Sequence, residues 1–110
     1  MSDRLETLLN LQKKLAKELD SPRYPVAAAE RISVLSTAII HESVELQRLT
    51  NWKWWKKTRQ FDIELAREEL IDIWHFLLQA TIELGMSADD LLKYYTLKNK
   101  INLERKKSNY

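Results

Sequence analysis

The sequence predicts an all-α fold, because it contains few helix-breaking residues and its apolar residues recur with a helical period. Its 110 residues include one glycine and two prolines, the residue types that most often interrupt regular structure. Elsewhere apolar residues recur three and four positions apart, which is typical of helices with one buried face. A chain of this length is expected to form a single domain, residues 1–110, with one core.

Two helices are predicted in the N-terminal half, separated by a proline-containing turn over residues 21–25. Ser2 is expected to cap the first helix, which has apolar residues at positions 5, 8, 11, 15 and 19 and ends near residues 20–22. The second helix is expected from about Val26 to about Thr50. Residues 51–60 show no helical period and predict a loop.

Two more helices are predicted in the C-terminal half. The third is expected from about Asp62 to Gly85, since glycine is favoured just after a helix end. Ser87 and Asp90 have the spacing of a capping box and predict a fourth helix that continues to about Lys107. Four helices this rich in leucine, isoleucine and tryptophan are expected to leave apolar surface exposed, so we expect dimerisation to complete the helical bundle.

The second and third helices each carry two acids one turn apart: Glu42 with Glu45, and Glu69 with Asp72. Residues three positions apart lie about 60° apart around a helix, so each pair shares one edge. Both edges also carry apolar residues, which predicts that the four carboxylates face the helix interface. Glu68 falls on the side of His75 and Gln79 and is expected to be a surface acid.

Buried carboxylates are costly unless a cation compensates them. One such pair alone usually marks a solvated helix face, but two pairs within apolar arcs favour a metal site. Mg²⁺ prefers carboxylate oxygens, and Mn²⁺ is also possible. Zinc is not expected, because the chain has no cysteine and its two histidines, His41 and His75, lack the spacing of a zinc hydrolase.

Basic residues gather at 53–59 and 98–107, although the formal net charge is only +2. Lys98, Asn102 and Arg105 share one stripe of the fourth helix, followed by Tyr110, and could hold phosphates. Alternatively, cations near a helix C-terminus can stabilise the helix by interacting with its dipole. The tryptophans within residues 52–55 could stack on bases, form a lid, or pack at a core edge or dimer interface.

The four acids, with residues 46–68 between the two pairs, resemble the signature of the all-α nucleoside triphosphate pyrophosphohydrolases, the MazG-like superfamily. Within it, the chain resembles the dimeric dUTPases. That resemblance is carried by residues 52–56, Trp-Lys-Trp-Trp-Lys, by residues 69–76, Glu-Leu-Ile-Asp-Ile-Trp-His-Phe, and by the spacing of the basic stripe up to Tyr110.

The resemblance implies a MazG-like four-helix arrangement in which all four acids bind Mg²⁺ and act in catalysis. It also implies that one acid activates the attacking water, and Glu45 is the expected choice. Phosphate contacts are implied for Lys98, Asn102, Arg105, Tyr110 and Lys56. Contacts to the base are implied for Gln12 and Trp52.

The chain departs from the dimeric dUTPases at Ala16 and Lys17, where that family usually has Asn-Asp, and it lacks the usual insertion before the last helix. The expected function is Mg²⁺-dependent hydrolysis of dUTP to the monophosphate and pyrophosphate. The alternative is a MazG-like enzyme for dCTP or non-standard nucleotides. A non-catalytic helical dimer that binds single-stranded nucleic acid is a third reading, and it leaves the inward-facing acids unexplained.

The expected partners are therefore a nucleoside triphosphate and a second copy, as a homodimer or a dimer of dimers, with nucleic acid not expected. No apolar run approaches the roughly 20 residues of a membrane span, so no membrane partner is expected. The absence of cysteine and of a signal-peptide core predicts a cytoplasmic protein.

Overall fold

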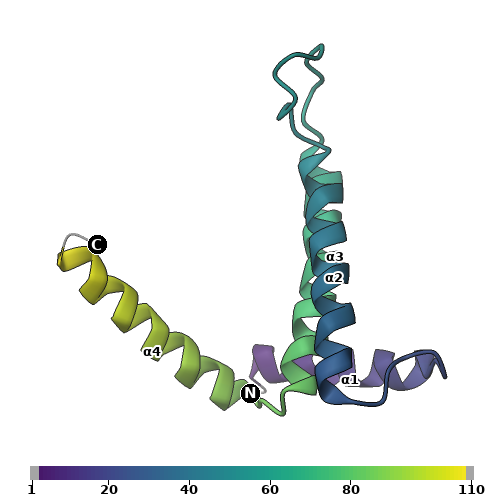
Figure 1. Ribbon diagram of the computed structural model, residues 1–110, viewed down its shortest axis with the longest axis vertical. Coiled ribbons are helices and arrows are strands. Elements are labelled where there is room, and N and C mark those ends of the chain that lie inside the picture. Colours follow the sequence, from purple (N-terminus) through teal and green to yellow (C-terminus); the bar gives the residue numbers. More distant parts are fainter. Residues whose placement is uncertain (1–2, 109–110) are drawn as a thin grey trace.

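The computed structural model describes residues 3–108 and contains four α-helices (Figure 1). They are α1 (Arg4–Leu19), α2 (Ala28–Gln47), α3 (Ile63–Glu83) and α4 (Ala88–Lys107). No strand occurs within residues 3–108, which confirms the all-α prediction. None of the helices in this part of the chain combines the length and apolar composition that a membrane span requires.

Local sequence sets most of the helix ends. Asp3 caps α1 by accepting a hydrogen bond from the Leu5 N–H at 3.0 Å, so the cap lies one residue after the predicted Ser2, which is outside the described residues. Asp62 caps α3 in the same way. The predicted capping box of Ser87 and Asp90 is confirmed, with hydrogen bonds in both directions.

Local sequence determines the end of α3 at Gly85 more strongly than it determines the two ends of α2. Gly85 follows α3 with a φ of 70°, a left-handed conformation that glycine adopts without strain. α2 begins at Ala28 rather than near Val26, and its first residues have no side-chain cap. It also ends at Gln47, slightly before the predicted Thr50, because the following residues form turns.

α2 and α3 form a long antiparallel hairpin, and the loop that joins them lies at its far end (Figure 1). α1 crosses the opposite end of the hairpin and packs on α3. The main buried cluster lies at this crossing and consists of Leu9, Leu78 and Ala88, with Leu5 and Ile82 packed against it. The core is therefore concentrated at one end of the hairpin.

α4 leans away from the hairpin, and its main contact is with α1 (Figure 1). Along this helix Ala88 is buried and Leu91 and Ile101 are half-buried, whereas the rest is exposed. Its exposed apolar side chains include Leu92, Tyr94, Tyr95, Leu97 and Leu103. The single chain is thus not a closed four-helix bundle, and completion by a second copy stays a prediction.

Leu78→Ala should lower the free energy of unfolding by about 2–4 kcal/mol, because it opens a cavity in the main buried cluster. Val26→Ala is the matched control, since the Val26 side chain is 90% exposed, and it should change this free energy by less than about 0.5 kcal/mol. Urea unfolding followed by circular dichroism measures both. Equal effects of the two variants would contradict the placement of the core.

Candidate functional site

Three of the four predicted acids come together between α2 and α3. Carboxylate oxygens of Glu42, Glu69 and Asp72 all lie within 4.8 Å of one another. Glu42 and Glu69 are half-buried and Asp72 is exposed. The antiparallel packing of α2 on α3 produces this grouping, since it places the two acid pairs at the same level of the hairpin. The spacing is close to that of oxygens around one divalent cation, so these three residues could hold a metal ion.

Glu45 does not belong to this group of three acids. Its carboxylate pairs with Arg48 at 3.3 Å, one turn further along α2, and its side chain is 52% exposed. The expectation that all four acids face a buried interface is therefore wrong for Glu45 and Asp72. The physical reason is that the hairpin is only two helices thick here, with neither α1 nor α4 covering it.

The acids repel one another, and the effect is concentrated on Glu69. Partial loss of solvent raises the pKa of Glu69 above its ordinary range, and the negative charges of Asp72, Glu42 and Glu45 raise it further. Glu68 contributes least to this shift and is exposed, as predicted for a surface acid. A divalent cation among the carboxylates would relieve the repulsion.

A cavity of about 550 Å³ lies at the base of the hairpin, between α1, the turn after it, α2 and α3. His75 and Phe76 line it from α3, and His75 follows Asp72 by three residues, or about 5 Å along the helix axis. Gln12, a predicted base-binding residue, lines it from α1. The cavity is thus about one helical turn from the three acids.

Part of the wall of this cavity is formed by two buried amide side chains. Gln12 and Gln79 are each 8% exposed, and the Nε2 of Gln12 donates to the Oε1 of Gln79 at 3.1 Å. The Nδ1 of His75 lies 2.9 Å from the Oε1 of Gln12. The expectation that Gln79 marks an exposed side of α3 is wrong, because α1 covers that face near its end.

The polar residues of the cavity that sequence reasoning missed include Tyr24, Arg31, Gln79 and Glu83. The pattern offered one signal, since Gln79 follows Asp72 by seven residues and so shares its stripe of α3. Burial raises the pKa of the Tyr24 phenol, and the charge of Glu83 raises it further. The Tyr24 oxygen is buried and has no hydrogen-bond partner among the described residues.

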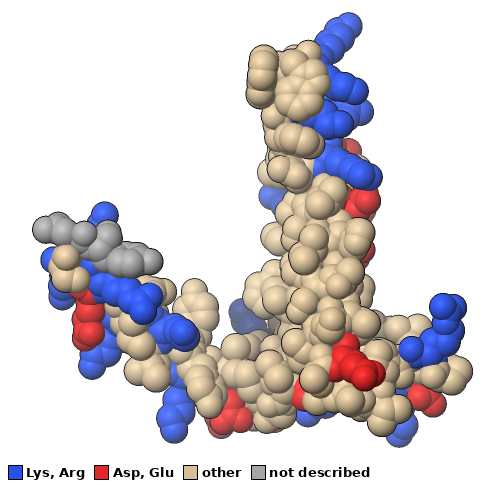
Figure 2. Space-filling view, in the orientation of Figure 1, with Lys and Arg blue, Asp and Glu red and all other residues tan. Residues whose placement is uncertain are grey.

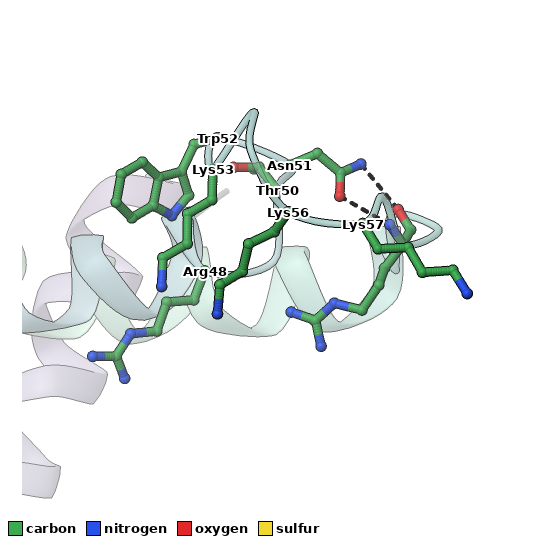
Figure 3. Close-up of a pocket in the computed structure, with 8 residues that line it drawn as sticks. Arg48, Thr50, Asn51, Trp52, Lys53, Lys56 and Lys57 are labelled. Atoms are coloured by element: carbon green, nitrogen blue, oxygen red, sulfur yellow. Dashed lines mark hydrogen bonds between the residues drawn. The ribbon is translucent and has the colours of Figure 1, made fainter.

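Residues 48–59, here called the basic tip, form the opposite end of the hairpin (Figure 2). The Asn51 side chain closes the loop through two 3.0 Å hydrogen bonds with the backbone of Arg59. A hollow of about 370 Å³ is lined there by Trp52 and five cations: Arg48, Lys53, Lys56, Lys57 and Arg59. Arg48, Lys53 and Lys56 extend their charged ends to the same side (Figure 3).

The structure does not bring all of the predicted binding residues together within one chain. Gln12 and Trp52 lie at opposite ends of the hairpin, so the expected base pocket containing both is not formed by a single copy. Lys98, Asn102 and Arg105 lie on α4, which leans away from the acids (Figure 1). The reason is that α4 packs mainly on α1. Tyr110 lies outside the described residues.

Glu69→Gln should raise the melting temperature of the metal-free protein near neutral pH. A raised carboxyl pKa means that the folded state binds the proton more tightly than the unfolded state, so stability falls as pH rises from the ordinary glutamate pKa to the raised one. The gain should vanish at pH values below both. Thermal unfolding in EDTA at several pH values measures it.

Glu64→Gln is the control for this experiment, because Glu64 is exposed on α3 and forms an ion pair with Arg67, away from the three acids. It should produce no such gain. A Glu69→Gln variant that melts no higher than the unsubstituted protein in EDTA near pH 7 would contradict the repulsion.

Three phage proteins are similar in sequence to this chain. It is 39% identical over 72 residues to a dCTP pyrophosphatase of Enterobacteria phage T4, covering 54% of this chain and 42% of that protein. It is 36% identical over 72 residues to the dCTP pyrophosphatase of Enterobacteria phage LZ5, covering 54% and 41%. A DNA replication protein of phage T4 is 39% identical over 62 residues, covering 44% of this chain and 16% of that protein.

The chain spans less than half the length of the two pyrophosphatases that it matches. No solved structure matches it. A family model described as dUTPase matches residues 4–88, which include the four acids, Gln12 and the basic tip but not the stripe on α4. With most of its length matched by that model, the chain belongs to this dUTPase family.

Proposed function

We propose that this chain is a nucleoside triphosphate pyrophosphohydrolase, which converts a pyrimidine deoxynucleoside triphosphate into the monophosphate and pyrophosphate. The observation that carries the proposal is the group of three carboxylates, Glu42, Glu69 and Asp72, within one turn of a polar cavity. Membership of the dUTPase family and the names of the two phage relatives support the same reaction.

The order of features along the hairpin matches the order of groups in a nucleotide. The cavity around Gln79 comes first, Asp72 lies seven residues or about 10 Å before Gln79 on α3, and the basic tip lies beyond the start of that helix. A deoxynucleoside triphosphate has a base, a sugar and then a chain of phosphates. We assign the base to the cavity, the phosphates to the acids through a cation, and the outer phosphate charge to the basic tip.

Each residue then has a specific task in this proposal. Glu42, Glu69 and Asp72 would hold Mg²⁺ or Mn²⁺. When bound, the cation would neutralise charge on the triphosphate and make the phosphorus atom attacked by water more electrophilic. Glu45 lies outside the group of three acids and pairs with Arg48. We propose that it is the general base that accepts a proton from the attacking water. Lys56 extends from the basic tip toward the same side as Arg48 and would bind phosphate oxygens.

The two candidate substrates are dUTP and dCTP. The family model carries the description dUTPase, whereas two relatives are named dCTP pyrophosphatase. Uracil and cytosine differ in the groups at ring positions 3 and 4, so the polar side chains of the cavity wall must decide between them. The departure from the dimeric dUTPases at Ala16 falls in this wall, since Ala16 lines the cavity.

Pyrophosphate release from a panel of nucleoside triphosphates tests the reaction directly. With Mg²⁺ we expect turnover of dCTP, dUTP or both, and no turnover in excess EDTA. Asp72→Asn should reduce kcat by at least about a hundredfold, because it removes one charge from the proposed metal ligands. Glu68→Gln is the matched control on the same helix and should change kcat by less than about twofold.

Full activity in EDTA would remove the metal from the proposal. Loss of activity in both variants would point to general disruption of α3 instead of a loss of a ligand. Failure to hydrolyse any nucleotide of the panel would overturn the proposed function.

We further propose that the active form is a homodimer, or a dimer of dimers, in which a second copy supplies the α4 stripe. We expect the exposed apolar side chains on α4 to be covered, because packing of an apolar face supplies most of the stability of a helix in a protein. The charges are complementary: Lys98 and Arg105 are cationic, and the proposed site is acidic. An α4 helix from the partner laid against the hairpin would complete phosphate binding.

A complementation assay tests this arrangement. Asp72→Asn and Arg105→Ala should each be nearly inactive alone, whereas a mixture refolded together should regain activity. In a mixed dimer, one site combines intact acids from one copy with an intact α4 from the other. With random pairing, about a quarter of the unsubstituted activity is expected, since half of the dimers are mixed and each holds one working site of two.

Lys107→Ala serves as the control for Arg105→Ala, because Lys107 lies at the end of α4 outside the stripe. It should retain activity by itself. A fully active monomer in sedimentation would contradict the dimer, and two inactive variants that fail to complement would contradict supply of α4 by the second copy.

A further inference from the structure

A chain of hydrogen bonds forms one wall of the cavity and ends in an ion pair. The Nη1 of Arg31 lies 3.0 Å from the Oε2 of Glu83, whose side chain is 9% exposed. The other oxygen of Glu83 accepts a 2.7 Å hydrogen bond from the Nε2 of Gln79. The chain continues from Gln79 to Gln12 at 3.1 Å and from Gln12 to the Nδ1 of His75 at 2.9 Å.

The ion pair fixes the direction of every hydrogen bond in this chain. An ionised carboxylate only accepts, so Gln79 must turn its NH₂ group toward Glu83. Its oxygen then faces Gln12, which must donate with its own NH₂ group. The oxygen of Gln12 is thereby left for His75, so the Nδ1 of His75 must carry a hydrogen.

Arg31 is the origin of this polarity. Its guanidinium stays charged at any ordinary pH and keeps Glu83 an acceptor. It is itself held in place, because its Nε donates to the Pro25 carbonyl oxygen at 2.5 Å and its guanidinium lies 4.5 Å from the centre of the Tyr24 ring. The chain thus runs from α2 through α3 and α1 and back to α3.

We propose that Arg31 and Glu83 are positioning residues that hold His75 in the tautomer with a hydrogen on Nδ1. The Nε2 of His75 is then free to accept a hydrogen bond from a ligand in the cavity. The ligand chemistry that fits is an N–H donor on a pyrimidine edge, either the 4-amino group of cytosine or the N3–H of uracil. The identity of the ligand rests on the proposed function, whereas the tautomer does not.

Glu83→Gln is the variant that separates this role from simple packing. A carboxamide has nearly the shape of a carboxylate but can either donate or accept. The direction of the hydrogen bonds is then no longer imposed, and the two glutamines can turn over. His75 should become a mixture of tautomers, so its Nε2 would carry a hydrogen in part of the molecules.

Nitrogen-15 NMR of the imidazole rings measures the tautomer without any substrate. The spectrum is recorded at about pH 8. The chain has two histidines, and His41→Gln assigns their signals. We expect His75 to be protonated on Nδ1 in the unsubstituted protein and to show mixed signals in Glu83→Gln.

Two further variants control the experiment. Glu64→Gln makes the same substitution on α3 at an exposed ion pair outside the cavity, and it should leave the His75 signals unchanged. Arg31→Lys keeps the positive charge and should keep the Nδ1–H tautomer. In kinetics, Glu83→Gln should raise KM for the preferred nucleotide about tenfold and change kcat less than about twofold, as for the loss of one binding hydrogen bond.

Each outcome decides the proposal. A hydrogen on Nε2 of His75 in the unsubstituted protein would overturn it, and that spectrum needs no variant to fold. An unchanged tautomer in a folded Glu83→Gln protein would remove Glu83 from the role. The expected tautomer in a protein that hydrolyses no nucleotide would keep the positioning role and overturn only the proposed function.

Discussion

The antiparallel packing of α2 against α3 is the contact on which every proposed functional feature depends. It sets Glu42 beside Glu69 and Asp72, and it carries the basic tip where the chain turns between the two helices. It also provides two walls of the cavity, which α1 completes by crossing the end of the hairpin opposite the basic tip. A shift of α2 along α3 would move Glu42 away from Glu69 and Asp72, and it would also disrupt the cavity.

This arrangement concentrates like charge where little protein covers it. Partial loss of solvent and the neighbouring acids raise the pKa of Glu69. The basic tip gathers five cations around one hollow, and the sequence has no acid between residues 46 and 61. Such clusters oppose folding by self-repulsion. In the proposed function, a cation would neutralise the acids and a polyphosphate would neutralise the basic tip, so substrate binding would relieve both repulsions.

The cavity at the other end contains a chain of hydrogen-bonded groups, in which Gln12 and Gln79 are buried. There a single ion pair between Arg31 and Glu83 gives direction to two amides and a histidine. Burial strengthens these hydrogen bonds and makes an unpaired polar group costly. In the proposed function, the cavity would recognise the base, and the acids and the basic tip would neutralise the phosphates through a cation and through direct contacts.

The sequence by itself determined the all-α class, four helices within a few residues, the capping box at Ser87 and three acids of the group, because these depend on local period and on residues one turn apart. The resemblance to the dimeric dUTPases also predicted a binding role for Gln12. Tertiary structure decided that Glu45 and Asp72 are exposed, that Gln79 is buried, that Gln12 and Trp52 lie apart and that α4 leans away from the acids. These outcomes depend on which helix covers which face. Contacts between distant segments set that coverage, and no local pattern encodes them.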